Sequence, residues 1–146
     1  MVIEPNAPSV IPGRAEMQVQ FRDADPARLA LFETALHELV ADAERAGPCR
    51  VEIEPTARSE PRPMDPGFQK EIEAAAERYA PAGHMRLPSA AGHDAAVLSY
   101  RMPAGMMFIP SRGGISHHWS EDTREDDIVL GAQVFADAAE HILRAT

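Results

Sequence analysis

Gly105-Met-Met-Phe-Ile109 is a run without one polar side chain, and Pro110 ends it. Because both faces of such a segment are apolar, it is typical of a strand covered on two sides, as in a mixed or parallel sheet. Loops that follow such strands commonly line ligand sites. The run therefore predicts a buried strand and directs attention to the loops around it.

The loop after this run carries a candidate metal ligand. Gly114-Ile-Ser-His117 brings an imidazole close behind the predicted strand, and Glu121 lies within about one helical turn of it. The alternative is a polar, partly exposed loop histidine. Neighbouring side chains on an extended loop point apart, so His117 and His118 do not easily bind one ion together, and we favour His117.

A second candidate loop precedes the run, at Ser89-Ala-Ala-Gly-His-Asp-Ala95. Asp94 or Ser89 could simply cap a short helix. Gly92 would also leave backbone N–H groups open to an anionic group beside His93. A serine nucleophile at Ser111 or Ser116 is disfavoured, because neither lies in a Gly-x-Ser-x-Gly turn and no orienting acid is evident.

Helices are predicted on both sides of this region. Asp65-Pro66 is a cap followed by proline, and Thr123-Arg-Glu-Asp126 is similar to a capping box. The apolar residues of the first helix are Phe68, Ile72, Ala75, Ala76 and Tyr79, and those of the last are Ile128, Ala132, Phe135, Ala139 and Ile142. Both sets recur at helical spacing.

The first part of the chain predicts a strand, a helix and a strand. Residues 16–21 and 49–54 alternate between apolar and polar side chains, and Asp25-Pro26 opens a helical pattern that Gly47 ends. This unit alone buries little, so further strands should join it. The prolines of 55–63 suit a connection, which places one domain at 1–60 and another at 61–146.

Arg22 stands where the first predicted strand ends, beside Asp23. A guanidinium there could bind a substrate carboxylate through two hydrogen bonds, or it could be an ordinary solvated strand end.

Composition excludes several classes of protein. The 146 residues carry 23 acidic and 14 basic side chains, a net charge of -9, which argues against nucleic acid as a partner. No apolar run is long enough for a membrane span, and no signal pattern opens the sequence, so a cytoplasmic protein is expected. Cys49, the single cysteine, is expected to be a small apolar strand residue.

In combination, these motifs resemble the hydantoinase/carbamoylase family of metal-dependent amidohydrolases, over nearly the whole chain. Pro5-Asn-Ala-Pro-Ser-Val-Ile-Pro-Gly13 and Met17-Gln-Val-Gln-Phe-Arg-Asp23 are similar to its lid domain, and Pro61-Arg-Pro-Met-Asp65 to the return to its catalytic domain. Ser89 to Ala95 resembles its Ser-Gly-Ala-Gly-His-Asp-Ala motif. Phe108-Ile-Pro-Ser111, Gly114 to His117 and Glu121 resemble its Phe-x-Pro-Ser, Gly-Ile-Ser-His and Glu signature.

The resemblance implies part of a two-domain zinc aminoacylase/carboxypeptidase-like fold, with an α+β lid segment and an α/β catalytic segment. It implies two metal ions (Zn, Mn, Co or Ni) that activate a water to attack an N-carbamoyl amino acid or related ureido acid. His117 becomes a metal ligand and Arg22 a clamp on the substrate carboxylate. Ser9, Gly92, His93 and Gly114 become substrate-binding residues, and the lid segment a homodimer contact.

The sequence also departs from that family. Ser9 replaces a substrate-binding Asn, Gln20 an Asp, Ala90 a Gly and Trp119 a Pro. The other metal ligands and the catalytic Glu of the family have no counterpart, so no catalytic residue is expected here. The expectation is the C-terminal part of an amidohydrolase, as a fragment or one piece of a split enzyme, inactive alone. The alternative is a non-catalytic remnant that serves as a dimerisation or interaction module.

Overall fold

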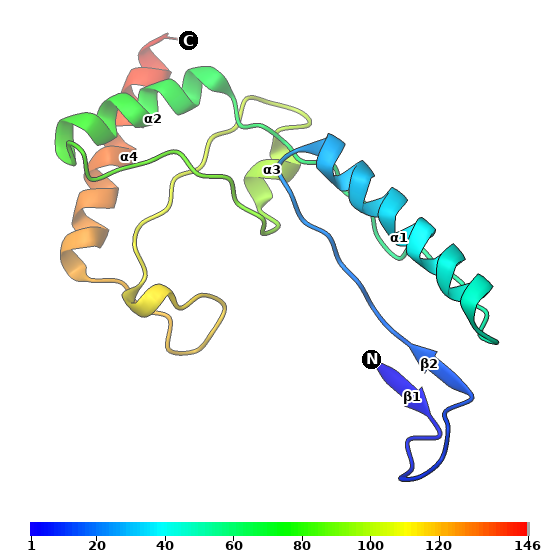
Figure 1. Ribbon diagram of the computed structural model, residues 1–146. Coiled ribbons are helices and arrows are strands. Elements are labelled where there is room, and N and C mark those ends of the chain that lie inside the picture. The colour runs from blue at the N-terminus through cyan, green and yellow to red at the C-terminus, as the bar shows by residue number, and fades with distance from the viewer. Residues whose placement is uncertain (146) are drawn as a thin grey trace. The chain divides into compact units, whose positions relative to one another are not determined.

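The computed structural model describes residues 1–145. The chain divides into two compact units, Met1–Pro61 and Arg62–Thr146, each of which is described by itself. Figure 1 shows the elements of both units along the chain. None of the helices in residues 1–145 is both long and apolar enough to cross a bilayer.

The first unit contains a hairpin and one long helix. Strands β1 (Val2–Glu4) and β2 (Arg14–Glu16) pair antiparallel, with Ile3 opposite Ala15. Helix α1 (Pro26–Ala46) begins after Asp25, whose carboxylate accepts the Ala27 N–H at 2.9 Å, and Gly47 ends it. The predicted helix and its cap are confirmed, because Asp satisfies a free N–H and proline needs no partner in the first turn.

Two strands predicted for the first unit are absent. Of residues 16–21 only Glu16 lies in a strand, and residues 49–54 form none. The Phe21 ring contacts that of Phe32 on α1, with 5.4 Å between centroids, yet no residue of α1 is buried. A strand needs a neighbour for its backbone groups, and residues 1–61 offer these segments none. Cys49 is exposed, contrary to the expectation of a packed strand position.

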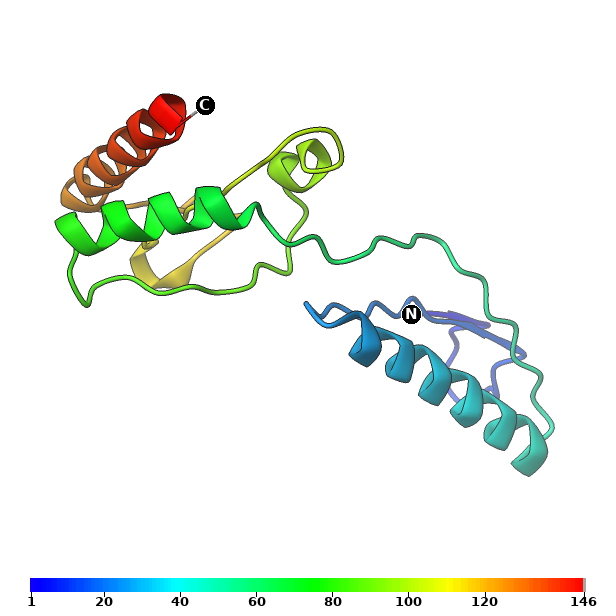
Figure 2. The same cartoon turned by 90° about the horizontal axis from the view of Figure 1, so that it is seen from above.

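The second unit is built on two packed helices. Helix α2 (Pro66–Tyr79) begins after Asp65, which accepts the Phe68 N–H at 2.9 Å. It packs on α4 (Glu125–Ala145), and Figure 2 shows the two side by side. Along the chain, helix α3 (Asp94–Leu98) and a 3-10 turn, η1 (Arg112–Gly114), come between α2 and α4. The buried cluster that joins α2 to α4 consists of Ala75, Ala76, Val134 and Ala138.

The predicted apolar face of α4 is not the face that packs. The residues buried on α4 are Gly131, Val134 and Ala138, whereas Ile128 is 49% and Phe135 63% exposed. Small side chains allow α4 to approach the alanines of α2 closely, so the broader apolar stripe faces solvent. The capping box is also absent, because Asp126 pairs with Arg124 instead of Thr123.

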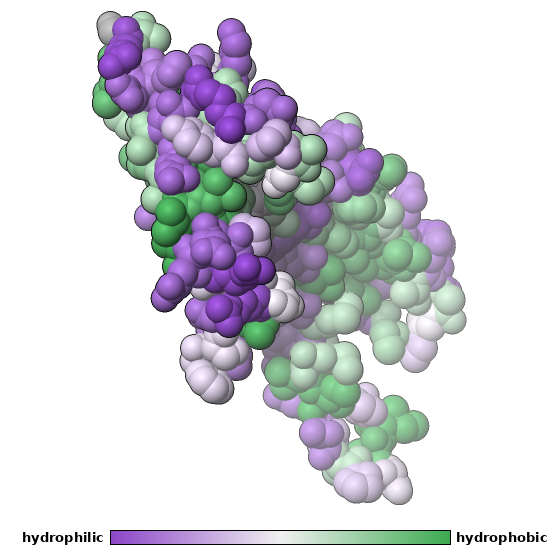
Figure 3. Space-filling model, turned by 90° about the vertical axis from the view of Figure 1, so that its left-hand side faces the viewer, coloured by the Kyte–Doolittle hydropathy of each residue, from purple (hydrophilic) through white to green (hydrophobic). Residues whose placement is uncertain are grey.

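The central apolar run forms no strand. Residues 105–109 follow an extended path without a paired neighbour, and Phe108 remains 52% exposed. Figure 3 shows hydrophobic areas, in green, among the hydrophilic areas of the surface. The total accessible surface is 12169 Å², against about 7,400 Å² for a compact monomer of this mass. The chain therefore exposes much apolar surface that a complete domain would bury.

Candidate active site

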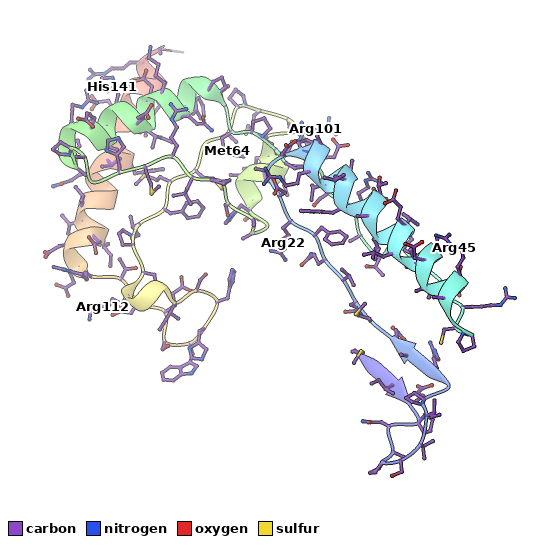
Figure 4. All side chains as sticks on the ribbon, in the orientation of Figure 1. Arg22, Arg45, Met64, Arg101, Arg112 and His141 are labelled. Carbon is purple, nitrogen blue, oxygen red and sulfur yellow. The ribbon has the colours of Figure 1, made fainter. Side chains whose placement is uncertain are left out.

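The loop that carries His117 is braced at its base. The Arg112 N–H donates to the Asp122 carbonyl at 2.8 Å, and its Nε lies 3.0 Å from the Asp122 carboxylate. Figure 4 labels Arg112 at η1, where the loop begins. Sequence reasoning missed this pair, because an arginine and an aspartate ten positions apart carry no pattern that predicts a contact.

His117 stands at the tip of this loop in a left-handed conformation, with φ 58°. Its backbone N–H donates to Glu121 Oε2 at 2.8 Å. Glu121 thus fixes the backbone of the histidine, a contact different from the predicted carboxylate partner of the ring. The exposed imidazole remains open to a ligand, as a contributor to a metal site requires.

His118 does not join His117. Its Nδ1 lies 2.8 Å from Ser120 Oγ, and its ring contacts the indole of Trp119 at 5.4 Å between centroids. His117 as the single candidate ligand therefore stays a prediction. The hydrogen bond from its backbone to Glu121 leaves the imidazole available for a metal ion.

Gly114 also has a positive φ, 68°, and its N–H donates to the Ser111 carbonyl at 3.1 Å. A side chain would be strained there, so glycine is required by the turn itself. At Gly92, by contrast, a Cβ would meet nothing within 4 Å and no positive φ occurs. Backbone conformation and crowding therefore do not explain Gly92 within residues 62–145.

The other candidate loop is organised around His93. Its Nε2 lies 2.7 Å from Ser89 Oγ, and its ring contacts that of Phe108 with 5.4 Å between centroids. The capping interpretation is wrong in detail, since His93 occupies the N-cap of α3 without a side-chain bond to it. No hydrogen bond or ring contact joins His93 to His117.

Ser9 and Arg22 belong to the first unit. Ser9 is an exposed residue of the hairpin with φ 62°. The guanidinium of Arg22, labelled in Figure 4, donates to Gln20 Oε1 at 2.9 and 3.0 Å. Next to it, the Asp25 N–H donated to Asp23 holds the pKa of the Asp23 carboxyl below its usual value.

These residues do not form a metal centre by themselves. Within residues 1–145 no group of three or more His, Cys, Asp or Glu side chains is arranged to hold a metal ion. A zinc site takes at least three protein ligands, and His117 is one. A two-metal centre therefore does not fit the described residues alone.

The comparisons with known proteins give these motifs a family. Residues 2–141 match the model of peptidase family M20/M25/M40, and the chain belongs to this family of hydrolases. Within it, the chain is similar to amidases of the hydantoinase/carbamoylase family. The crystal structure of such an amidase from Burkholderia phymatum is 41% identical, with a TM-score of 0.88 over 99% of this chain and 34% of that one.

Two relatives agree with that structure. Allantoate amidohydrolase of Bacillus subtilis is 34% identical over 92% of this chain, and N-carbamoyl-L-amino-acid amidohydrolase of Rhizobium meliloti is 32% identical over 94%. The chain spans about a third of the length of each, 32% and 33%. Its fold is accordingly part of the family's α/β architecture, which accounts for its unpaired extended segments.

Proposed function

We propose that this chain is the C-terminal part of an amidohydrolase that cleaves the C–N bond of N-carbamoyl amino acids or related ureido acids. The observation that carries the proposal is the likeness to the Burkholderia phymatum amidase over 99% of the chain. The names of the relatives supply the substrate class, because one acts on allantoate and another on N-carbamoyl-L-amino acids.

We assign a role in the complete enzyme to each candidate residue. His117 contributes one ligand to a centre of two divalent ions (Zn, Mn, Co or Ni), whose other ligands belong to polypeptide outside this sequence. Arg22, held by Gln20, is a donor for the substrate carboxylate. Ser9 in the first unit and Gly92, His93 and Gly114 in the second are assigned to substrate binding. A single imidazole leaves the chain without hydrolase activity on its own.

The domains and partners follow the same proposal. Residues 1–60 are the C-terminal part of a lid and dimerisation domain, and 61–146 the C-terminal part of the catalytic domain. The lid segment supports a homodimer, or the chain associates with a polypeptide that matches the rest of its relatives. Neither nucleic acid nor a membrane is a partner, and we place the protein in the cytoplasm.

A second function is favoured by the departures of the sequence from the family that it resembles, above all Ser9 in place of a substrate-binding Asn. A non-catalytic remnant that serves as a dimerisation or interaction module would not need that Asn. The exposed apolar surface of the second unit would then be its contact surface.

Co-expression separates the two functions. The chain is produced with the N-terminal two thirds of the Burkholderia phymatum amidase, and release of the free amino acid from N-carbamoyl-L-alanine is measured with added Mn²⁺. We expect turnover by the pair and none by either part. A pair that co-purifies but stays inactive supports the remnant, whereas turnover by the 146-residue chain alone contradicts the assignment of the missing ligands.

A further inference from the structure

The ring of His93 is fixed from several sides. Ser89 Oγ lies 2.7 Å from Nε2, and the Phe108 ring packs against the imidazole at an interplanar angle of 55°. The backbone of His93 is the N-cap of α3, and its side chain is half-buried. An exposed, unsupported histidine would sample several rotamers, whereas these contacts hold one ring orientation.

The contacts of Ser89 favour one tautomer of the His93 imidazole. The Ala91 N–H donates to Ser89 Oγ at 3.3 Å, so the hydroxyl already accepts one bond. The hydroxyl could still accept a second bond, from an Nε2–H, but its own proton has no other acceptor among residues 1–145. Donation to Nε2 uses that proton, and it requires Nε2 to be unprotonated. A neutral imidazole that accepts at Nε2 carries its proton on Nδ1.

The remaining nitrogen has a different environment. Among residues 1–145, His93 makes its side-chain hydrogen bond through Nε2 and has none at Nδ1. In the Nδ1–H tautomer this N–H is a donor that the described residues leave free for a ligand. A half-buried N–H beside an aromatic ring is stabilised when a ligand oxygen accepts from it. A carbonyl or carboxylate oxygen provides such an acceptor.

We propose that Ser89 is a positioning residue that holds His93 in the Nδ1–H form and directs this N–H to an oxygen of the bound ureido acid. The identity of that oxygen rests on the proposed function. The effect of Ser89 on the imidazole rests on the geometry of this loop alone. Ser89 thus acts on the substrate only through His93.

The imidazole ¹⁵N spectrum of the full 146-residue chain tests whether Ser89 holds His93 in the Nδ1–H form. At a pH where His93 is neutral, two-bond ¹H–¹⁵N correlations should show a protonated Nδ1 and an unprotonated Nε2. Ser89→Ala should shift His93 toward the Nε2–H form, and Ser89→Thr, which keeps the hydroxyl, should retain the Nδ1–H form. Ser116→Ala is the matched control and should leave His93 unchanged. An Nε2–H form in the unaltered chain, or a spectrum insensitive to Ser89→Ala, overturns the proposal.

Kinetics of the co-expressed pair test whether the Nδ1–H of His93 binds the substrate. Because one hydrogen bond to substrate is lost, Ser89→Ala should raise KM for N-carbamoyl-L-alanine about tenfold, and Ser89→Thr should restore it. Equal loss in both variants overturns the positioning role while the hydrolase function stands. If the unaltered pair has no turnover, the proposed function fails, and the imidazole spectrum still decides what Ser89 does to His93.

Discussion

At the scale of single residues, His117 at the loop tip has an unusual backbone conformation. A φ of 58° is uncommon for a residue with a side chain. Such a conformation costs about 1–3 kcal/mol and persists where neighbouring contacts hold it. The Glu121 carboxylate supplies that contact by accepting the His117 N–H.

Replacement of His117 tests its role as a ligand. In the co-expressed pair, His117→Ala should lower kcat/KM for N-carbamoyl-L-alanine by at least about a hundredfold, because loss of a ligand weakens metal binding and activity together. His118→Ala, which removes the adjacent ring, should retain most activity. Equal activity of both variants would contradict the assignment, and circular dichroism checks that each variant keeps its helices.

Gly131 provides a test of packing in the second unit. A Cβ at this position would lie 2.4 Å from Ile109 Cγ2, so Gly131→Ala forces a shift of the neighbouring segment. The expected cost is about 1–3 kcal/mol in the free energy of unfolding, reduced by the better helix propensity of alanine. The thermal midpoint should fall, and the added change Ile109→Ala should restore part of it. An unchanged midpoint would show that α4 and residue 109 are not in contact.

The candidate residues were predictable from the sequence to different degrees. Gly114 is recognisable, because a Gly-Gly pair before a histidine indicates a turn with positive φ. The bond between Ser89 and His93 was not, since four-residue spacing in a loop has no fixed geometry. The missing metal ligands could be inferred only from the resemblance.

At the scale of elements, the residues at which helices begin could be predicted from local sequence, whereas strand formation could not. Asp25 and Asp65 cap helices that begin at the prolines after them, as their sequence predicts. Residues 49–54 alternate in polarity but form no strand, because no neighbouring segment of residues 1–61 pairs with them. The face of α4 that packs was missed because periodicity does not reveal which neighbour a helix meets.

An ion pair that ties α2 to the following loop predicts a pH dependence. Arg86 donates to Glu73 at 2.6 and 3.1 Å, and this hydrogen bonding holds the pKa of the Glu73 carboxyl below its ordinary 4.5. A lowered folded-state pKa contributes stability that is present above pH 4.5 and is lost as the pH falls through the folded-state value.

Thermal unfolding followed by circular dichroism measures this contribution. At pH 7, Glu73→Gln should be less stable than the unaltered chain. This difference should shrink as the pH falls through the lowered pKa of Glu73, because the carboxylate of the unaltered chain is then protonated. The effect is small, because the pair is exposed to solvent. Glu77→Gln on the same helix, next to His84, is the comparison variant. A difference between Glu73→Gln and the unaltered chain that is independent of pH would contradict the assigned ion pair.

At the scale of the whole molecule, the exposed area is the main physical fact. An accessible surface of 12169 Å² for 146 residues leaves apolar side chains such as Phe135 and Phe108 exposed. Burial of apolar area stabilises by about 25 cal/mol per Å², so this surface favours association. The unpaired segment 105–109 offers backbone groups to a neighbouring strand as well.

Trp119 reports on such association, because it is the single tryptophan and is 91% exposed. In the chain alone its fluorescence should have the long-wavelength emission of indole in water and should be readily quenched by iodide. If the loop of His117 enters a shared cleft, addition of the N-terminal part of the amidase should shift the emission to shorter wavelength and reduce quenching. Emission unchanged in a co-purified complex would place this loop outside the contact.

The most direct test replaces the C-terminal third of the Burkholderia phymatum amidase with this chain in one polypeptide. We measure kcat/KM of the chimera for N-carbamoyl-L-amino acids and allantoate with Mn²⁺ or Zn²⁺. The account predicts turnover of at least one of these substrates, abolished by His117→Ala. A folded chimera without turnover of any of them would contradict the account.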